Sequence, residues 1–205
     1  MRSVSHASKT VISCIGLVAA LLGAGAGAAS AEASGPATTV DEAVRQAGII
    51  AGVIADLPPE VVESATPSVC FSGHVQDIGW QPWMCDDDGN WAFAGTTGNG
   101  LRLEALRVAP SGTGGVTCVQ AHVQNQGWQP SKCVHDNTYT EIGTVGLGLR
   151  MEALSFSSST RTTCAEAHMQ SYGWLGNQCA PAGQATVVGI ASLGLRMEAV
   201  EGKID

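Results

Sequence analysis

Hydrophobic and polar residues alternate along several short segments of this chain, and this alternation predicts β-strands. The segments VCFSGHV at 69–75 and TCVQAHV at 117–123 place every second residue on one apolar side. A period of two is typical of a half-buried strand. The segment LRMEAL at 149–154 also alternates. We expect Leu149, Met151 and Ala153 on one face of this strand, and Arg150, Glu152 and Leu154 on the other. Glycine-rich stretches such as GTTGNG and GTVGLG separate these segments and predict turns.

One nine-residue pattern occurs three times, as HVQDIGWQP at 74–82, HVQNQGWQP at 122–130 and HMQSYGWLG at 168–176. A closing block, GLRLEAL, GLRMEAL or GLRMEAV, follows each copy at the same offsets of 48 and 46 residues. This periodicity predicts three repeats, at about 69–108, 116–155 and 162–200, within a domain over 67–203. An open stack would expose sheet edges, so we expect closure around a pseudo-threefold axis. A β-prism-like and a β-trefoil-like domain both satisfy this all-β expectation.

The first 66 residues have a different composition. Arg2 and Lys9 precede an apolar run over 11–22 and a small-residue stretch that ends at Ala31, which predicts a secretory signal peptide over 1–31. An uncleaved anchor is the alternative. Residues 32–66 are expected to form a leader with a short helix over about 40–55, before the proline pair at 58–59. The mature chain would then have no membrane span and be secreted or associated with the cell surface.

The charge balance narrows the choice of partners. The whole chain has 10 Lys and Arg against 18 Asp and Glu, and the expected cleavage removes Arg2 and Lys9, which leaves a net charge of −10. Nucleic acid and anionic membrane surfaces bind through clustered cations, so neither is an expected partner.

Six cysteines follow the repeat. Each pair is 15 residues apart: Cys70 and Cys85, Cys118 and Cys133, Cys164 and Cys179. We expect each pair to form a disulfide that joins the first two strands of its repeat. Zinc binding is the alternative, although no C-x-x-C spacing occurs.

The blocks HVQDIGWQPW and GLRLEALRV resemble the clostridial hydrophobic repeat with a conserved tryptophan, and the resemblance covers Val69 to Val200. It implies a secreted or surface-attached, non-catalytic module that binds polysaccharide or mediates adhesion. The third repeat departs most, with Met169 in place of Val and Leu175-Gly176 in place of Gln-Pro. If the repeats carry sites, the third is expected to have lost its own.

The five tryptophans are the candidate ligand-binding residues. Trp80, Trp128 and Trp174 repeat, and each is expected to plug the core of its own repeat, with stacking on a sugar ring as the alternative. Trp83 and Trp91 occur in the first repeat alone and are the better candidates for facing a ligand. No nucleophile with an adjacent base and no asymmetric carboxylate pair stands out, so no catalytic residue and no cofactor are expected.

The repeated charged residues predict a structural polar network in each repeat. Its members are His74, Arg102 and Glu104; His122, Arg150 and Glu152; and His168, Arg196 and Glu198. Arg and Glu two apart on a strand share one face. Three histidines around an axis are also a possible metal site, and CDDDGN at 85–90 resembles a calcium loop without its ligand spacing, but no metal is expected.

These observations favour a secreted, non-enzymatic protein that binds cell-wall or extracellular polysaccharide. Three copies of a weak site on one scaffold would act together on a polymer. A structural or protein-adhesion module of the cell envelope is one alternative. A secreted enzyme inhibitor, acting through the loop WMCDDDGNWAF of the first repeat, is another.

Overall fold

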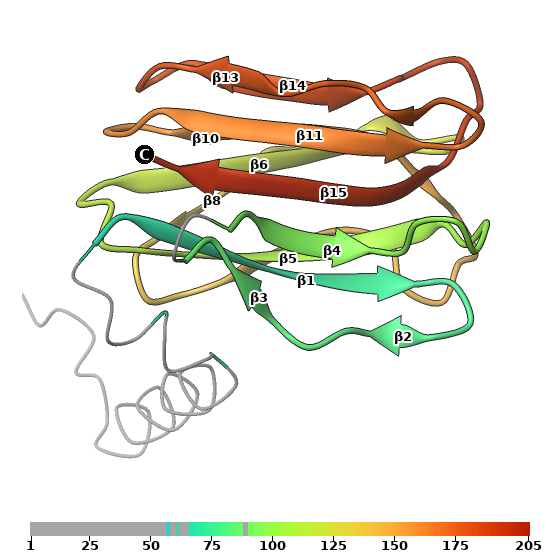
Figure 1. Ribbon diagram of the computed structural model, residues 1–205, viewed down its shortest axis with the longest axis horizontal. Helices are drawn as coiled ribbons and strands as arrows, with labels where there is room; N and C mark the ends of the chain where they lie inside the picture. Colours follow the sequence, from blue (N-terminus) through green and yellow to red (C-terminus); the bar gives the residue numbers. More distant parts are fainter. Residues whose placement is uncertain (1–56, 58–60, 62–65, 88–89) are drawn as a thin grey trace, which may run out of the picture. The chain divides into compact units, whose positions relative to one another are not determined.

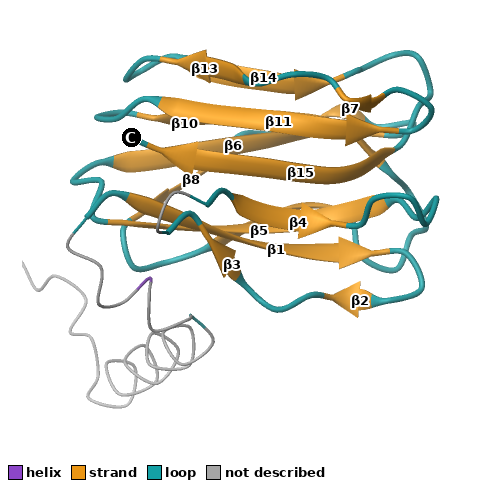
Figure 2. Cartoon of the chain, viewed as in Figure 1, coloured by secondary structure: helices purple, strands orange, loops and turns teal. Residues whose placement is uncertain are grey.

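The computed structural model describes residues 57, 61, 66–87 and 90–205. They belong to the second of two compact units, which begins at residue 39. The expected signal peptide and the expected helix over 40–55 lie outside the described residues. Strands make up nearly all the regular structure (Figure 2), which confirms the all-β prediction. Within these residues no helix has the length and apolar character needed to cross a membrane.

The described residues contain 15 strands, five in each repeat, and each repeat includes a two-residue strand at its Gly-Trp pair. The first repeat comprises β1 (Ser68–Val75), β2 (Gly79–Trp80), β3 (Met84–Cys85), β4 (Ala92–Gly95) and β5 (Leu103–Ser111).

The second repeat comprises β6 (Val116–Val123), β7 (Gly127–Trp128), β8 (Lys132–His135), β9 (Thr140–Gly143) and β10 (Met151–Ser158). The third comprises β11 (Thr163–Met169), β12 (Gly173–Trp174), β13 (Gln178–Ala180), β14 (Ala185–Gly189) and β15 (Met197–Ile204).

Each repeat builds one antiparallel sheet of five strands but gives its fourth strand to another repeat. The first sheet has the order β2-β1-β5-β9 with β3 on β1, so it takes β9 from the second repeat. The second sheet takes β14 from the third repeat. The third sheet takes β4 from the first repeat, and Figure 1 shows β4 beside β15 although they are far apart in sequence. The exchange therefore closes on itself.

A glycine makes each exchange possible. Gly95, Gly143 and Gly189 end the exchanged strands with φ of 111°, 86° and 92°, a region that side chains disfavour. A Cβ at Gly143 would lie 2.4 Å from the carbonyl oxygen of Glu104 in the receiving sheet. The repeated glycine is thus a backbone requirement of the exchange.

A β-bulge interrupts the long pair of each sheet at the same place. His74 pairs with Ala105 and Val75 with Leu103, so Glu104 has no partner residue in the register. The same shift occurs at Glu152 and Glu198. A bulge reverses the facing of the residues beyond it. The expected alternation over 149–154 is therefore wrong, because Met151, Glu152, Ala153 and Leu154 are all buried.

One apolar core joins the three repeats. Phe71 of the first repeat and Phe156 of the second are fully buried, with ring centroids 5.9 Å apart. Met169 and Met197 of the third repeat belong to the same cluster. The three disulfides join Cys70 to Cys85, Cys118 to Cys133 and Cys164 to Cys179, which confirms the predicted pairing.

Candidate functional site

The structure brings the predicted polar network together in each repeat. Glu104 is buried. Its Oε1 accepts a hydrogen bond from Arg102 Nε at 2.8 Å and also lies 2.7 Å from Arg102 Nη2. His74 Nδ1 lies 3.1 Å from Glu104 Oε2, at ion-pair distance but outside hydrogen-bond geometry. The second and third repeats match, with Glu152 and Glu198 buried in the same position. In each repeat, the arginine and the histidine thus lie on the two oxygens of one buried glutamate.

The repeated nine-residue pattern is first of all a turn. Asp77, Asn125 and Ser171 lie in the left-handed region with φ of 62°, 63° and 67°. The glycine two residues later also has a positive φ in each copy. Asp and Asn tolerate the left-handed region better than most residues, and glycine adopts it freely. The pattern therefore recurs in part because each hairpin turns in the same way.

The glutamine after the tryptophan ties this turn to the exchanged strand. Gln81 Nε2 donates to the carbonyl of Gly95 at 2.9 Å, and the Gly95 amide donates to Gln81 Oε1 at 2.7 Å. Gln129 binds Gly143 in the same two ways, at 3.2 and 2.8 Å. The third repeat has Leu175 here, which cannot make either bond. The sequence change in the third repeat therefore removes the two hydrogen bonds that join the turn to the exchanged strand in the other two repeats.

The expectation that the repeated tryptophans plug the core is wrong. Trp128 and Trp174 are 42% and 39% exposed, and Trp80 is half-buried. Each ring lies on the outer face of its sheet in edge contact with the histidine of its own repeat, with centroids 5.3 to 5.4 Å apart. The core is filled instead by strand residues such as Phe71 and Phe156, and the short β2-type strand carries its tryptophan to the sheet edge.

Two of the candidate tryptophans have one face covered. The Arg107 guanidinium lies 3.9 Å from the centre of the Trp80 ring and bonds Glu141 at 3.2 Å. Trp83 packs on a small second cluster that contains Leu57 and Val61, and its ring lies 5.8 Å from that of Tyr139. Trp83 therefore stabilises the packing of Leu57 and Val61 on the first sheet as well as facing the groove described next.

Each repeat has a groove between its β3-type strand and its exchanged strand, and the three grooves differ in chemistry. In the second repeat the groove is about 320 Å³ and is lined by polar residues, Lys132 and Gln129 among them, beside Trp128. In the third it is about 210 Å³ and aliphatic, with Leu175 and Val187. In the first it is about 540 Å³ and aromatic. The first has the most aromatic lining of the three, and aromatic side chains with a few polar groups are typical of a ligand site.

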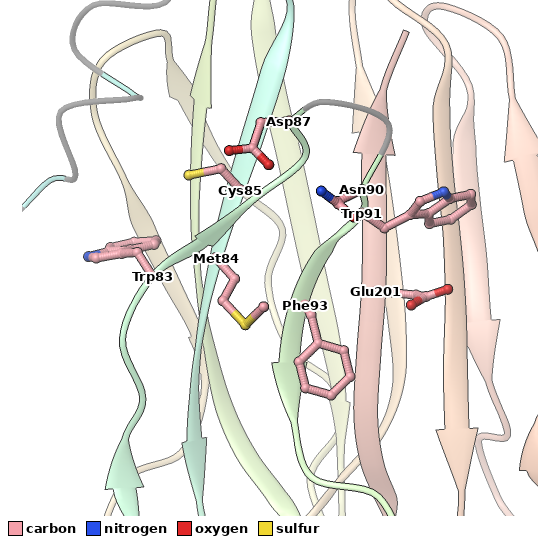
Figure 3. Close-up of a pocket in the computed structure, with 8 residues that line it drawn as sticks. All are labelled: Trp83, Met84, Cys85, Asp87, Asn90, Trp91, Phe93 and Glu201. Atoms are coloured by element: carbon pink, nitrogen blue, oxygen red, sulfur yellow. The ribbon is translucent and has the colours of Figure 1, made fainter.

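We call this first groove the aromatic groove; Figure 3 draws its lining residues. They are Trp83, Met84, Cys85, Asp87, Asn90, Trp91, Phe93 and Glu201. Trp83 and Trp91 lie on opposite sides in Figure 3, with Met84 and Phe93 between them. The structure therefore brings the two unrepeated tryptophans to one groove, although three of the five candidates do not line it.

Glu201 enters this groove through the strand exchange. It lies on β15 directly opposite Phe93 of β4 on one side and Glu166 of β11 on the other. Trp174 completes the row, with its ring 6.4 Å from that of Phe93. Burial, and then the charge of Glu166, raise the pKa of Glu201. Sequence reasoning missed Glu166 and Glu201, and it included Phe93 only as the last residue of the loop WMCDDDGNWAF. The one signal for Phe93 is that it stands two residues after Trp91 and shares its strand face.

Asp86 follows β3 directly and joins β15 to β1 through hydrogen bonds. Its carboxylate accepts hydrogen bonds from Ser68 Oγ at 2.6 Å and from the Ile204 amide at 2.8 Å. Burial raises the pKa of Asp86 to about 6, although these donors lower it. Its chemistry is that of a half-buried carboxyl group that joins two strands.

The family model described as Clostridial hydrophobic W matches residues 74–115 and 122–157. No curated protein and no solved structure matches the chain. The third repeat lies outside the matched ranges, although it has the same turn, bulge and polar network as the other two. Three disulfides and the family together indicate an extracellular repeat protein. Residues 74–115 and 122–157 are two adjacent repeats of the Clostridial hydrophobic W family.

Proposed function

We propose that this protein is a secreted, non-catalytic binding protein that recognises cell-wall or extracellular polysaccharide through the aromatic groove. The observation that carries the proposal is the difference in lining among the grooves of the three repeats. The first alone combines two tryptophans, a phenylalanine and a methionine with polar groups at its rim. Flat aromatic faces stack on the apolar faces of sugar rings, and rim polar groups fix the orientation of a ligand.

The length of the aromatic surface favours an extended ligand over a small one. Trp174 lies 6.4 Å from Phe93, which leads into the groove with Trp91. On the other side, Trp83 contacts Tyr139. Aromatic rings therefore form a row that crosses from the third sheet to the first sheet. Several successive sugar units of a polymer suit such a row better than one monosaccharide does.

The cyclic strand exchange also favours a prism-like arrangement of the three sheets over a trefoil. In this proposal, the repeat is present in three copies, but one copy alone carries the ligand site. The multivalency expected from triplication is then given up, because the second groove has one tryptophan where the first has two, and the lining of the third is aliphatic rather than aromatic.

A glycan array combined with a pull-down on whole cell walls tests the proposal. We expect retention of the parent protein on at least one polysaccharide, and loss of most of that retention in Trp91→Ala and Phe93→Ala. Trp128→Ala is the matched control, because it removes a repeated, exposed tryptophan from the second groove. No retention on any polysaccharide would overturn the proposal, as would equal loss in Trp128→Ala.

An adhesion module is a second candidate, supported by exposed apolar residues in the loops that follow the exchanged strands. Val145, Leu147 and Leu193 are 44%, 62% and 62% exposed. Capture of one protein from an envelope extract, abolished by Leu147→Ser with Leu193→Ser and unaffected by Trp91→Ala, would favour this candidate.

A further inference from the structure

The outer faces of the three sheets carry different charges at equivalent positions. In the first sheet the central row is Ser72, Arg107 and Glu141, and the arginine and glutamate form an ion pair. In the second sheet the row is uncharged: Gln120, Ser155 and Val187. In the third sheet it is Glu166, Glu201 and Phe93. The third sheet therefore has two like charges side by side and next to the aromatic groove.

Neither of these carboxylates has a cationic partner among the described residues. Glu166 Oε1 is held by the Gly176 amide at 2.8 Å, which fixes its position without neutralising it. Lys203 lies two residues from Glu201 on the same strand face. Its ammonium, however, is 2.7 Å from Asp205 and lies against the Trp91 ring. Like charges directly opposite each other on neighbouring strands are unfavourable. Consistent with this, the pKa of Glu201 is raised by burial and by Glu166.

Aromatic rings surround this negative pair. Phe93 is opposite Glu201, Trp174 contacts Phe93, and Trp91 and Glu201 line the same groove. The faces of aromatic rings attract cations, and carboxylates beside them strengthen the attraction. The described residues bring no group of three or more His, Cys, Asp or Glu together, whereas calcium needs six to eight oxygen ligands. The arrangement suits an organic ammonium group better than a metal ion.

We propose that the aromatic groove selects polysaccharides with free amino groups, the ammonium lying between Glu166 and Glu201 while a sugar face stacks on Trp91 or Phe93. This inference rests on the proposed function and specifies its ligand class. The chain's excess of acidic over basic residues, 18 against 10, favours the approach of a cationic polymer. An N-acetylated sugar would lose the charge attraction and keep only the stacking.

Calorimetry with two hexasaccharides tests the inference. The probes are a β-1,4-linked glucosamine hexamer and its fully N-acetylated counterpart, at low ionic strength and mildly acidic pH. We expect the glucosamine hexamer to bind about tenfold more tightly. Glu201→Gln and Glu166→Gln should each remove most of that preference, because the affinity for the glucosamine hexamer falls more than the affinity for the N-acetylated hexamer. Glu141→Gln is the matched control, because it removes the exposed carboxylate at a neighbouring row that already has its arginine.

Equal affinity for the two hexamers, or a preference that survives Glu201→Gln, would overturn the inference. Binding of polylysine with no binding of the glucosamine hexamer would also overturn it. These failures differ from a failure of the proposed function. If a neutral polysaccharide binds and depends on Trp91, the proposed function stands and only the amine preference is wrong. If no saccharide binds, both proposals fall. Increasing salt should weaken binding of the amine form alone.

Discussion

Single residues in this domain divide into those that hold each repeat together and those that face outward. Glu104 and its equivalents are buried between an arginine and a histidine, so their charge is balanced inside the repeat. Trp128 lies outside its sheet and touches the ring of His122 edge-on. Such a contact adds about 0.5–1.5 kcal/mol to what burial contributes. The motif tryptophan is therefore a surface residue with a modest structural role.

Trp128→Ala tests this assignment. We expect the free energy of unfolding to fall by about 1–2 kcal/mol, because almost half of the side chain is already exposed. Phe156→Ala, which empties a fully buried site, should cost about 3–5 kcal/mol. Urea unfolding of both variants gives the comparison. An equal loss in the two would show that Trp128 is a core residue after all.

Asp86 predicts a pH dependence of stability. Its pKa is about 6 in the folded protein, where burial disfavours the charge, and 3.8 is its ordinary value. The folded state therefore holds the proton more tightly than the unfolded state. The stabilisation is complete below about pH 4 and is lost as the pH rises through 6, an effect on the order of 2–3 kcal/mol.

Asp86→Asn removes this titration. The difference in unfolding free energy between Asp86→Asn and the parent should shift in favour of the variant by about 2–3 kcal/mol from pH 4 to pH 7. Other carboxylates titrate in both proteins and cancel in the difference. Chemical denaturation at several pH values measures it. A difference that stays constant with pH would contradict the buried-carboxyl account.

At the scale of strands, the exchanged strand depends on a glycine where it meets the receiving sheet. Gly143→Ala would place a Cβ 2.4 Å from the Glu104 carbonyl oxygen, at a φ of 86°. We expect a loss of more than about 3 kcal/mol, because the obstacle is backbone. Gly146→Ala is the control: its φ is 75°, but nothing lies within 4 Å of the new Cβ. It should cost about 1 kcal/mol. Similar thermal unfolding curves for the two variants would contradict the close approach.

The strands also show where sequence reasoning succeeds and fails. Alternation locates β1 and β6, since their inward residues Val69, Phe71 and Val119 are buried as expected. Alternation fails across Glu104, because a bulge adds one residue to one strand and a period of two carries no sign of that addition. Cysteine spacing gives the disulfides because both partners belong to one repeat. The strand exchange has no such local signal.

For the whole molecule, the closed exchange makes each repeat dependent on the others. The third sheet receives β4, and the second receives β14. We therefore expect a chain that ends at residue 158 to lack a cooperative unfolding transition, since β4 and β10 each lose a partner and the core loses Met169 and Met197. Urea titration followed by tryptophan fluorescence checks this. A sharp, reversible transition in the two-repeat chain would show that the repeats fold separately.

The same closure explains why only part of the site could be predicted from sequence. Trp83 and Trp91 stand out because the other repeats lack them, and both line the groove. Glu201 is more than 100 residues away in the chain and reaches Phe93 only because the third sheet accepts β4. The Trp83 packing on Leu57 and Val61 is equally non-local. Periodicity predicts the scaffold. The site is defined by residues that differ between the repeats and by the residues that the strand exchange brings beside them.

The central claim is that the protein has three repeats and one ligand site. Fluorine NMR of the chain labelled with fluorotryptophan tests it directly, because the five tryptophans report separately on the three repeats. The titrant is a hexasaccharide fragment of whichever polysaccharide the array retains. The account predicts that the Trp91 signal shifts most and Trp174 less, while Trp80 and Trp128 stay unchanged. Parallel shifts of Trp80, Trp128 and Trp174, with Trp91 unchanged, would contradict it and place a site in every repeat.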